Sequence, residues 1–129
     1  MNRPKARIFA LDDEPSIVET WTLILRTQGY DVEAFTSPLD ALEAIRENPP
    51  DLIVSDVNLP HMTGIDLVIT LEKESIPTKV LLCSGAPTTS FFLDRAIAEG
   101  HSLEVLAKPV GPRELLRQVR VLLNEESFL

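Results

Sequence analysis

The sequence predicts an α/β fold in which one parallel, doubly wound sheet of five strands is covered by helices on both faces. Short apolar runs, typical of parallel strands, alternate five times with segments whose apolar residues recur at helical spacing. The ten prolines are about twice the average share, and almost all fall between these segments, where a missing backbone donor does least harm. Strict alternation with short connections implies right-handed crossovers between parallel strands.

The first two repeats show the alternation clearly. Residues 7–11 are a nearly continuous apolar strand, and the helix after it ends at Gly29. Residues 31–35 alternate polar and apolar side chains, which predicts a strand with one partly wet face at an edge of the sheet. The second helix opens at residues 37–38 and stops at the proline pair 49–50.

The rest of the chain repeats the pattern three more times. The predicted elements are a strand at 52–54, a helix that begins at Gly64, a strand at 79–83, a helix at 88–99, a strand at 103–107 and a helix that begins at Pro112. No linker is long enough to divide them, and no internal repeat is visible. We therefore expect one domain over residues 1–129, with its core between about 6 and 124 and no output domain.

Composition excludes several classes of protein. A chain of 129 residues that is 44% hydrophobic and 25% charged is not disordered. Its net charge of −8 argues against direct binding to nucleic acid, which needs clustered positive charge. The sequence has neither an apolar run near the ~20 residues of a bilayer span nor a secretory signal, so we expect no membrane association. One cysteine, Cys83, excludes an intrachain disulfide, and we expect a reduced cytoplasmic protein.

Polar side chains gather at the carboxyl ends of the predicted strands, where sheets of this class bind ligands. Asp12 and Asp13 follow the first strand, and Asp56 ends the third. Ser84 follows the fourth strand and Lys108 the fifth. Helix capping or turn formation explains each of them alone. Their convergence on one edge of the sheet favours a functional site.

Three carboxylates in one crevice repel one another, and a divalent cation relieves that repulsion. Oxygen ligands without a cluster of Cys or His point to Mg²⁺, which takes one or two carboxylates together with a phosphate oxygen. Lys108 and the Ser84 hydroxyl would then contact the remaining phosphate oxygens. This assembly suits phosphoryl transfer to a carboxylate.

The same residues resemble the receiver domain of two-component response regulators. The resemblance rests on Asp12-Asp13, the run DVNLPHMTG at residues 56–64, Ser84 and Lys108-Pro109, and it covers essentially the whole chain. It implies a flavodoxin-like fold with strand order 2-1-3-4-5. It also implies that Asp56 accepts phosphate from a histidine kinase or a phosphotransfer protein in a reaction that depends on Mg²⁺.

The resemblance also implies roles for the neighbouring residues. The implied magnesium ligands are Asp13, Asp56 and the Asn58 backbone carbonyl directly, and Asp12 through water. Ser84 would be the switch hydroxyl, and Lys108 would pair with the phosphate. The chain would be a signalling module rather than a metabolic enzyme, with self-phosphorylation and autodephosphorylation at Asp56 as its only chemistry.

Some positions depart from the family pattern. Val105 stands where receivers usually carry Tyr or Phe, and a short β-branched side chain cannot swing a ring between buried and exposed positions. We therefore expect weak coupling between the phosphorylation site and the output surface. Arg113, Arg117 and Arg120 recur along one face of the last helix, and they are either a solvated face or a surface for acidic groups of a partner.

Partners and alternatives stay partly open. A histidine kinase or phosphotransfer protein and a downstream protein target are implied, with the chain as a monomer or a weak dimer through the fourth helix, fifth strand and fifth helix. The chain either stands alone or is a segment of a hybrid histidine kinase or a larger regulator. A magnesium-dependent phosphohydrolase would need a second Asp where Asn58 stands, and a flavin-binding carrier would not place Asp12 and Asp13 beside its phosphate.

Overall fold

A single parallel sheet forms the centre of the computed structural model, which describes residues 5–85, 94–95, 97–100 and 103–125. Its strands are β1 (Arg7–Leu11), β2 (Asp31–Phe35), β3 (Leu52–Asp56), β4 (Lys79–Ser84) and β5 (Glu104–Ala107). All neighbouring strands pair in parallel, in the order β2-β1-β3-β4-β5. The predicted fold and strand order are confirmed, and β2 lies at an edge as its alternating pattern predicts.

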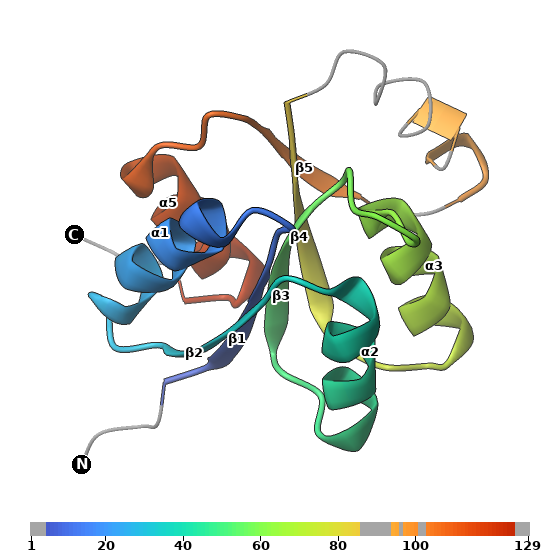
Figure 1. Cartoon of the computed structure of the whole chain (residues 1–129), viewed down its shortest axis with the longest axis horizontal. Coiled ribbons are helices and arrows are strands. Elements are labelled where there is room, and N and C mark those ends of the chain that lie inside the picture. The colour runs from blue at the N-terminus through green and yellow to red at the C-terminus, as the bar shows by residue number, and fades with distance from the viewer. Residues whose placement is uncertain (1–4, 86–93, 96, 101–102, 126–129) are drawn as a thin grey trace.

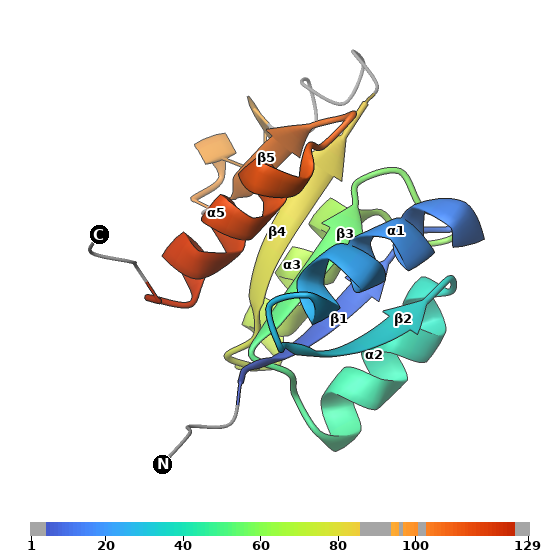
Figure 2. The ribbon, with the colours of Figure 1, turned by 90° about the vertical axis from the view of Figure 1, so that its left-hand side faces the viewer.

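Helices cover both faces of this sheet. The described helices are α1 (Pro15–Arg26), α2 (Pro38–Glu47), α3 (Gly64–Lys73) and α5 (Pro112–Leu122). Helices α1 and α5 lie on one face, and α2 and α3 lie on the other (Figures 1 and 2). The helix predicted at 88–99 falls mostly outside the described residues, among which 94–95 and 97–98 are helical. No helix of the described ranges is both long and apolar enough to cross a lipid bilayer.

The strands extend further toward the polar residues than the apolar runs suggest. Strand β3 continues past Val54 to Asp56, and β4 continues to Ser84, because the backbone ladder does not require an apolar side chain. Asp56 is paired in register with Cys83, and Ser84 with Ala107. The regular sheet itself therefore positions two of the candidate site residues.

Each face of the sheet has its own hydrophobic core, because successive side chains of a strand point to opposite faces. Ile8 and Ala10 of β1 pack with Leu25 of α1 under α1 and α5. Phe9 and Leu11 of the same strand pack under α2 and α3. β1 is therefore buried on both faces, as its continuous apolar sequence predicts.

A polar contact joins the end of α5 to the corner between α1 and β2. The Tyr30 hydroxyl donates to Glu125 Oε1 at 2.8 Å, and the Lys5 ammonium lies 5.4 Å from the centre of the Tyr30 ring. Nearby, Arg120 Nη2 donates to Gln28 Oε1 at 3.2 Å. Burial, followed by the Glu125 carboxylate, raises the pKa of Tyr30 to about 12. The phenol is therefore favoured in its neutral, donating form.

We predict that Tyr30→Phe lowers the free energy of unfolding by about 1 kcal/mol at neutral pH, because it removes this hydrogen bond. The folded pKa lies above the ordinary value near 10, so the contribution of the Tyr30 hydroxyl is complete below about pH 10 and is lost as the pH rises toward 12. Urea unfolding at about pH 7 and about pH 11 measures the difference. Tyr30 is the only tyrosine, so no other phenol contributes. A difference that stays constant across this range would contradict the assignment.

Candidate functional site

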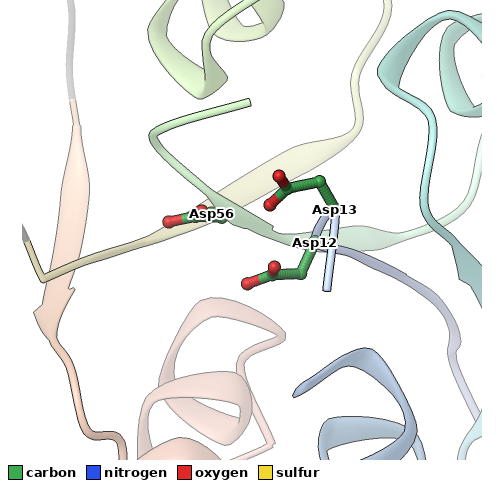
Figure 3. Close-up of side chains that lie close together, drawn as sticks. All are labelled: Asp12, Asp13 and Asp56. Atoms are coloured by element: carbon green, nitrogen blue, oxygen red, sulfur yellow. The ribbon is translucent and has the colours of Figure 1, made fainter. Parts of the chain in front are cut away.

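Three carboxylates converge at the carboxyl end of the sheet. Asp12 and Asp13 follow β1, and Asp56 is the last residue of β3, the strand that pairs with β1 (Figure 3). One carboxylate oxygen from each of them lies within 4.8 Å of the others. Asp12 and Asp56 are buried, at 1% and 7% exposure, whereas Asp13 is exposed. The strand order therefore brings together the three acidic residues that the sequence places at strand ends.

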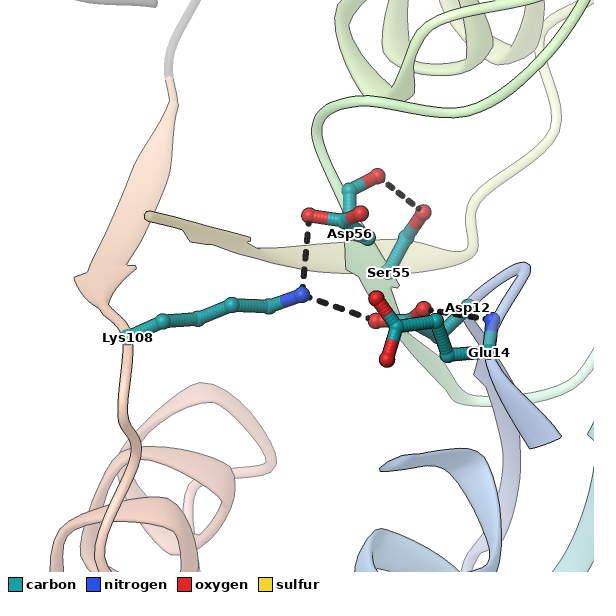
Figure 4. Close-up of polar contacts among 5 residues, drawn as sticks. All are labelled: Asp12, Glu14, Ser55, Asp56 and Lys108. Carbon is teal, nitrogen blue, oxygen red and sulfur yellow. Dashed lines mark hydrogen bonds and ion pairs between the residues drawn. The ribbon is translucent and has the colours of Figure 1, made fainter. Parts of the chain in front are cut away.

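Lys108 completes this cluster from the far edge of the sheet. It follows β5, and its side chain extends across the end of the sheet toward the acidic residues (Figure 4). Its Nζ lies 2.8 Å from Asp12 Oδ2 and 3.2 Å from Asp56 Oδ1. The other oxygen of Asp12 accepts a hydrogen bond from the Glu14 backbone N–H at 2.9 Å. The ammonium thus holds two buried carboxylates at once.

Burial and charge oppose each other at Asp56. Burial raises the pKa of the Asp56 carboxyl, while Lys108, through its charge and its hydrogen bond, lowers it. The nearby charge of Asp12 raises this pKa again, and the Asn58 backbone N–H, which donates to the carboxylate, lowers it. On balance the pKa of Asp56 lies above its ordinary value. The pKa of Lys108 is also raised, because the carboxylates of Asp12 and Asp56 outweigh the burial that would lower it.

The donor set fits a magnesium ion. The cluster offers only oxygen ligands, their spacing allows three carboxylates to face one ion, and Asp13 is open to solvent, which leaves room for bound water. Mg²⁺ retains several waters and binds through few protein ligands, so this open acidic cluster suits it. A cation there would also reduce the repulsion among the three carboxylates.

The loop after β3 approaches the site so closely that one position must lack a side chain. A Cβ at Gly64 would lie 2.7 Å from both the Asp56 carbonyl oxygen and Leu82 Cδ2, and 3.1 Å from Val57 Cα. The Gly64 N–H donates to the Val57 carbonyl at 2.8 Å. The start of α3 is therefore packed directly against the backbone of Asp56. The sequence marks Gly64 as the start of a helix and as part of the run at residues 56–64, but it does not show this close approach to Asp56.

A capping box fixes the same loop at its end. The Thr63 hydroxyl accepts from the Asp66 backbone N–H at 3.0 Å, and the Asp66 carboxylate accepts from the Thr63 N–H at 3.1 Å. Residues spaced as Thr63 and Asp66 are a recognised signal for a helix start. His61, in the middle of the loop, is exposed and has a φ of 68°, in the left-handed region.

Ser84 and Asn58 flank the cluster. Ser84 is half-buried at the end of β4, and its carbonyl accepts from the Lys108 backbone N–H at 2.9 Å. Asn58 is exposed, two residues after Asp56. A Cβ at Gly85 would make ordinary contacts of 3.4 Å and 3.6 Å with the Lys108 side chain. The Lys108 stem therefore runs beside Gly85 as it passes the end of β4.

The three arginines of α5 are not all exposed on one face of the helix. Arg113 and Arg117 are exposed, but Arg120 is half-buried and bonded to Gln28. The prediction that Arg120 shares their solvent face is therefore wrong, because Arg120 points toward the corner after α1. Val105 is exposed at 37%, on the edge strand. Phe91 and Phe92, which belong to the predicted fourth helix, lie outside the described residues.

Cys83 is fully buried in β4, as expected for a structural cysteine. Burial raises the pKa of its thiol to about 12, and the Lys108 ammonium only partly opposes this. A thiol held neutral in this way is a poor nucleophile and a poor metal ligand. The chemistry at this end of the sheet therefore rests on oxygen and ammonium groups.

Comparison with known proteins agrees with this geometry. The family model for the response regulator receiver domain matches residues 8–120. The DNA-binding response regulator MtrA of Mycolicibacterium smegmatis is 35% identical over 127 residues, a match that covers 98% of this chain and 54% of MtrA. The chain thus spans about half the length of this relative.

Solved structures give the same result. The receiver domain of Francisella response regulator 1452 superposes with a TM-score of 0.81 at 27% identity, covering 93% of this chain and 98% of that one. The chemotaxis response regulator CheY4 of Vibrio cholerae superposes with a TM-score of 0.79 at 29% identity, covering 92% and 98%. Fold, acidic cluster and family match agree, and the chain belongs to the response regulator receiver domain family.

Proposed function

We propose that this receiver domain accepts a phosphoryl group on Asp56 from a phosphohistidine of a histidine kinase or phosphotransfer protein. The observation that carries the proposal is the cluster itself, in which Asp12, Asp13 and Asp56 lie together and one ammonium contacts two of them. The known mechanism of the family is phosphorylation supported by Mg²⁺. We assign the parts of that mechanism to individual residues of this chain.

In the transfer step, a carboxylate oxygen of Asp56 forms a bond to phosphorus while the bond between phosphorus and the donor nitrogen breaks, and the imidazole leaves with the bonding electron pair. The product is an acyl phosphate on Asp56. Lys108 already lies 3.2 Å from Asp56, so its ammonium can move to a phosphoryl oxygen with a small change of side-chain torsions. We assign the Ser84 hydroxyl to donate to another phosphoryl oxygen from the end of β4.

Asp13 and Asp56, with the carbonyl of Asn58, would hold Mg²⁺, and Asp12 would act through a bound water. The ion supplies positive charge that stabilises the charge developing on the transferred group. Asp12 also has a second role in this arrangement, because its carboxylate holds Lys108 at 2.8 Å before transfer. In autodephosphorylation, water attacks the same phosphorus and Asp56 leaves as a carboxylate.

We further propose that the signal passes through contacts with other proteins, with the β5 and α5 face as the output surface. Arg113 and Arg117 are exposed there, and they suit acidic groups of a downstream partner or of a second copy. Val105 carries no ring that could move, so we expect a small phosphorylation-dependent change on this face. A cytoplasmic location stays a prediction.

The first test is covalent labelling. Incubation with a small acyl phosphate and Mg²⁺ should add one phosphoryl group to the intact protein, and omission of Mg²⁺ should greatly reduce the labelled fraction. Asp56→Asn should abolish labelling because the amide is not a nucleophile for this reaction, while Asp31→Asn, an exposed residue of β2, should label like the parent. Intact-mass measurement provides the readout. Labelling that persists in Asp56→Asn would assign the acceptor to another residue.

The second test is metal binding by Asp13. Asp13→Asn should weaken Mg²⁺ binding at least about tenfold because it removes a ligand. Ligand binding to the folded state raises the melting temperature, so the parent should gain thermal stability with Mg²⁺ and the variant should gain much less. Without Mg²⁺ the variant should be no less stable, since one of three clustered charges is gone. Equal stabilisation of both proteins by Mg²⁺ would show that Asp13 is not a ligand.

The third test separates Lys108 from the metal site. Lys108→Ala should slow labelling about tenfold or more, because the transferred group loses a cation. Its binding of Mg²⁺ should be unchanged or stronger, because the repulsion between Lys108 and the ion is removed. Lys79→Ala is a matched control, since Lys79 lies at the opposite end of the sheet and its ammonium contacts the Leu122 carbonyl. Unchanged labelling in Lys108→Ala would show that Lys108 has no role in the transfer and only forms ion pairs with Asp12 and Asp56.

A further inference from the structure

One contact of Lys108 lies outside the acidic cluster. The Lys108 Nζ is 5.7 Å from the centre of the Trp21 ring, and Trp21 belongs to α1 on the face of the sheet covered by α1 and α5. The ring is 4% exposed, so the surrounding core restrains its orientation. The ammonium therefore has three partners at once: the carboxylates of Asp12 and Asp56, and the indole of Trp21.

The indole of Trp21 can stabilise the Lys108 ammonium in a way that a further carboxylate could not. Its face attracts a cation within about 6 Å of the ring centre, yet it carries no net charge and does not titrate. The site already holds more negative groups than the single ammonium can neutralise. Trp21 therefore stabilises the buried ammonium without adding to the repulsion among the carboxylates.

Space beside these two side chains lets the ammonium change direction. A groove of about 540 Å³ runs between α1 and the segment after β5, and Trp21, Lys108 and Gly85 are among the residues that line it. Gly85 has no side chain beside the Lys108 stem, where an added Cβ would lie 3.4 Å from Lys108 Cβ and 3.6 Å from its Cδ. Lys108 can therefore shift from Asp56 to a phosphoryl oxygen while its ammonium stays near the ring.

We propose that Trp21 is a positioning residue that acts through Lys108, holding the ammonium at the site during transfer. This inference rests on the proposed function, because it concerns the same reaction at Asp56. The supporting geometry is a buried aromatic ring from α1 that contacts a cation from the segment after β5, although residues 21 and 108 lie far apart in the chain. Trp21 also makes the position of Lys108 visible, since it is the only tryptophan.

The first experiment is a double-mutant cycle on the rate of labelling with a small acyl phosphate and Mg²⁺. Trp21→Leu keeps an apolar side chain but removes the ring face, and it should slow labelling about fivefold. Trp21→Phe keeps a ring and should recover most of the rate. In the Lys108→Ala background, Trp21→Leu should have no further effect, because its target is gone.

Trp21→Leu also changes the packing of the hydrophobic core, so the effect of altered packing needs a separate control. Leu25→Ala creates a cavity in the same core from the same helix without removing the ring, so it should lower stability while the labelling rate stays near that of the parent. If Trp21→Leu slows labelling by the same factor in the parent and in Lys108→Ala, Trp21 acts on stability or packing and the inference is overturned. If the parent itself is not labelled on Asp56, the proposed function fails instead.

The second experiment detects the contact without relying on transfer. Lys108→Met should change the fluorescence emission of Trp21 in the unmodified protein, whereas Lys79→Met should leave it unchanged. Addition of beryllofluoride with Mg²⁺, a stable stand-in for the phosphoryl group, should change the emission of the parent and not that of Lys108→Met. Identical spectra for the parent and Lys108→Met would show that the ammonium does not act on the ring, and would overturn the inference even if labelling proceeds normally.

Discussion

Lys108 holds together two carboxylates that would otherwise repel each other at the end of the sheet. Its ammonium contacts Asp12 and Asp56, both of which are nearly inaccessible to water. Burying like charges side by side costs free energy, and a single cation offsets that cost only in part. The hydrophobic cores on the two faces of the sheet must supply the rest. A change of charge at Asp56 therefore alters every contact of Lys108.

The strand order makes this arrangement possible. Strands β1 and β3 are neighbours, so Asp12 and Asp56 meet directly, but β5 is separated from β3 by β4. Neighbouring strands lie about 4.8 Å apart, so a group that follows β5 must cross about 10 Å to reach Asp56. Lysine has the length to do this, and its stem runs beside Gly85 at the end of β4. Topology thus selects a long side chain at position 108.

Much of the fold and the site can be predicted from local pattern. The apolar run at β1 and the alternation at β2 predict a central and an edge strand, and the polar residues after each strand predict the cluster at one edge. Other features depend on residues distant in the chain. The close approach of Gly64 to Asp56 and Leu82, and the bond between Arg120 and Gln28, arise from the packing of separate elements. Helical spacing places Arg120 with Arg113 and contains no information about Gln28.

Burial is unequal across the sheet. Every residue of β3 is buried, whereas only Leu106 is buried among the four residues of β5. Substitutions in exposed positions usually change stability by no more than about 0.5 kcal/mol, and those in a fully buried strand cost several times more. Substitutions at the exposed positions of β5 therefore change the stability of the fold only slightly. A lineage of such domains can acquire new partner surfaces along this edge, while the acidic residues that follow β1 and end β3 stay beside the tightly packed central strands.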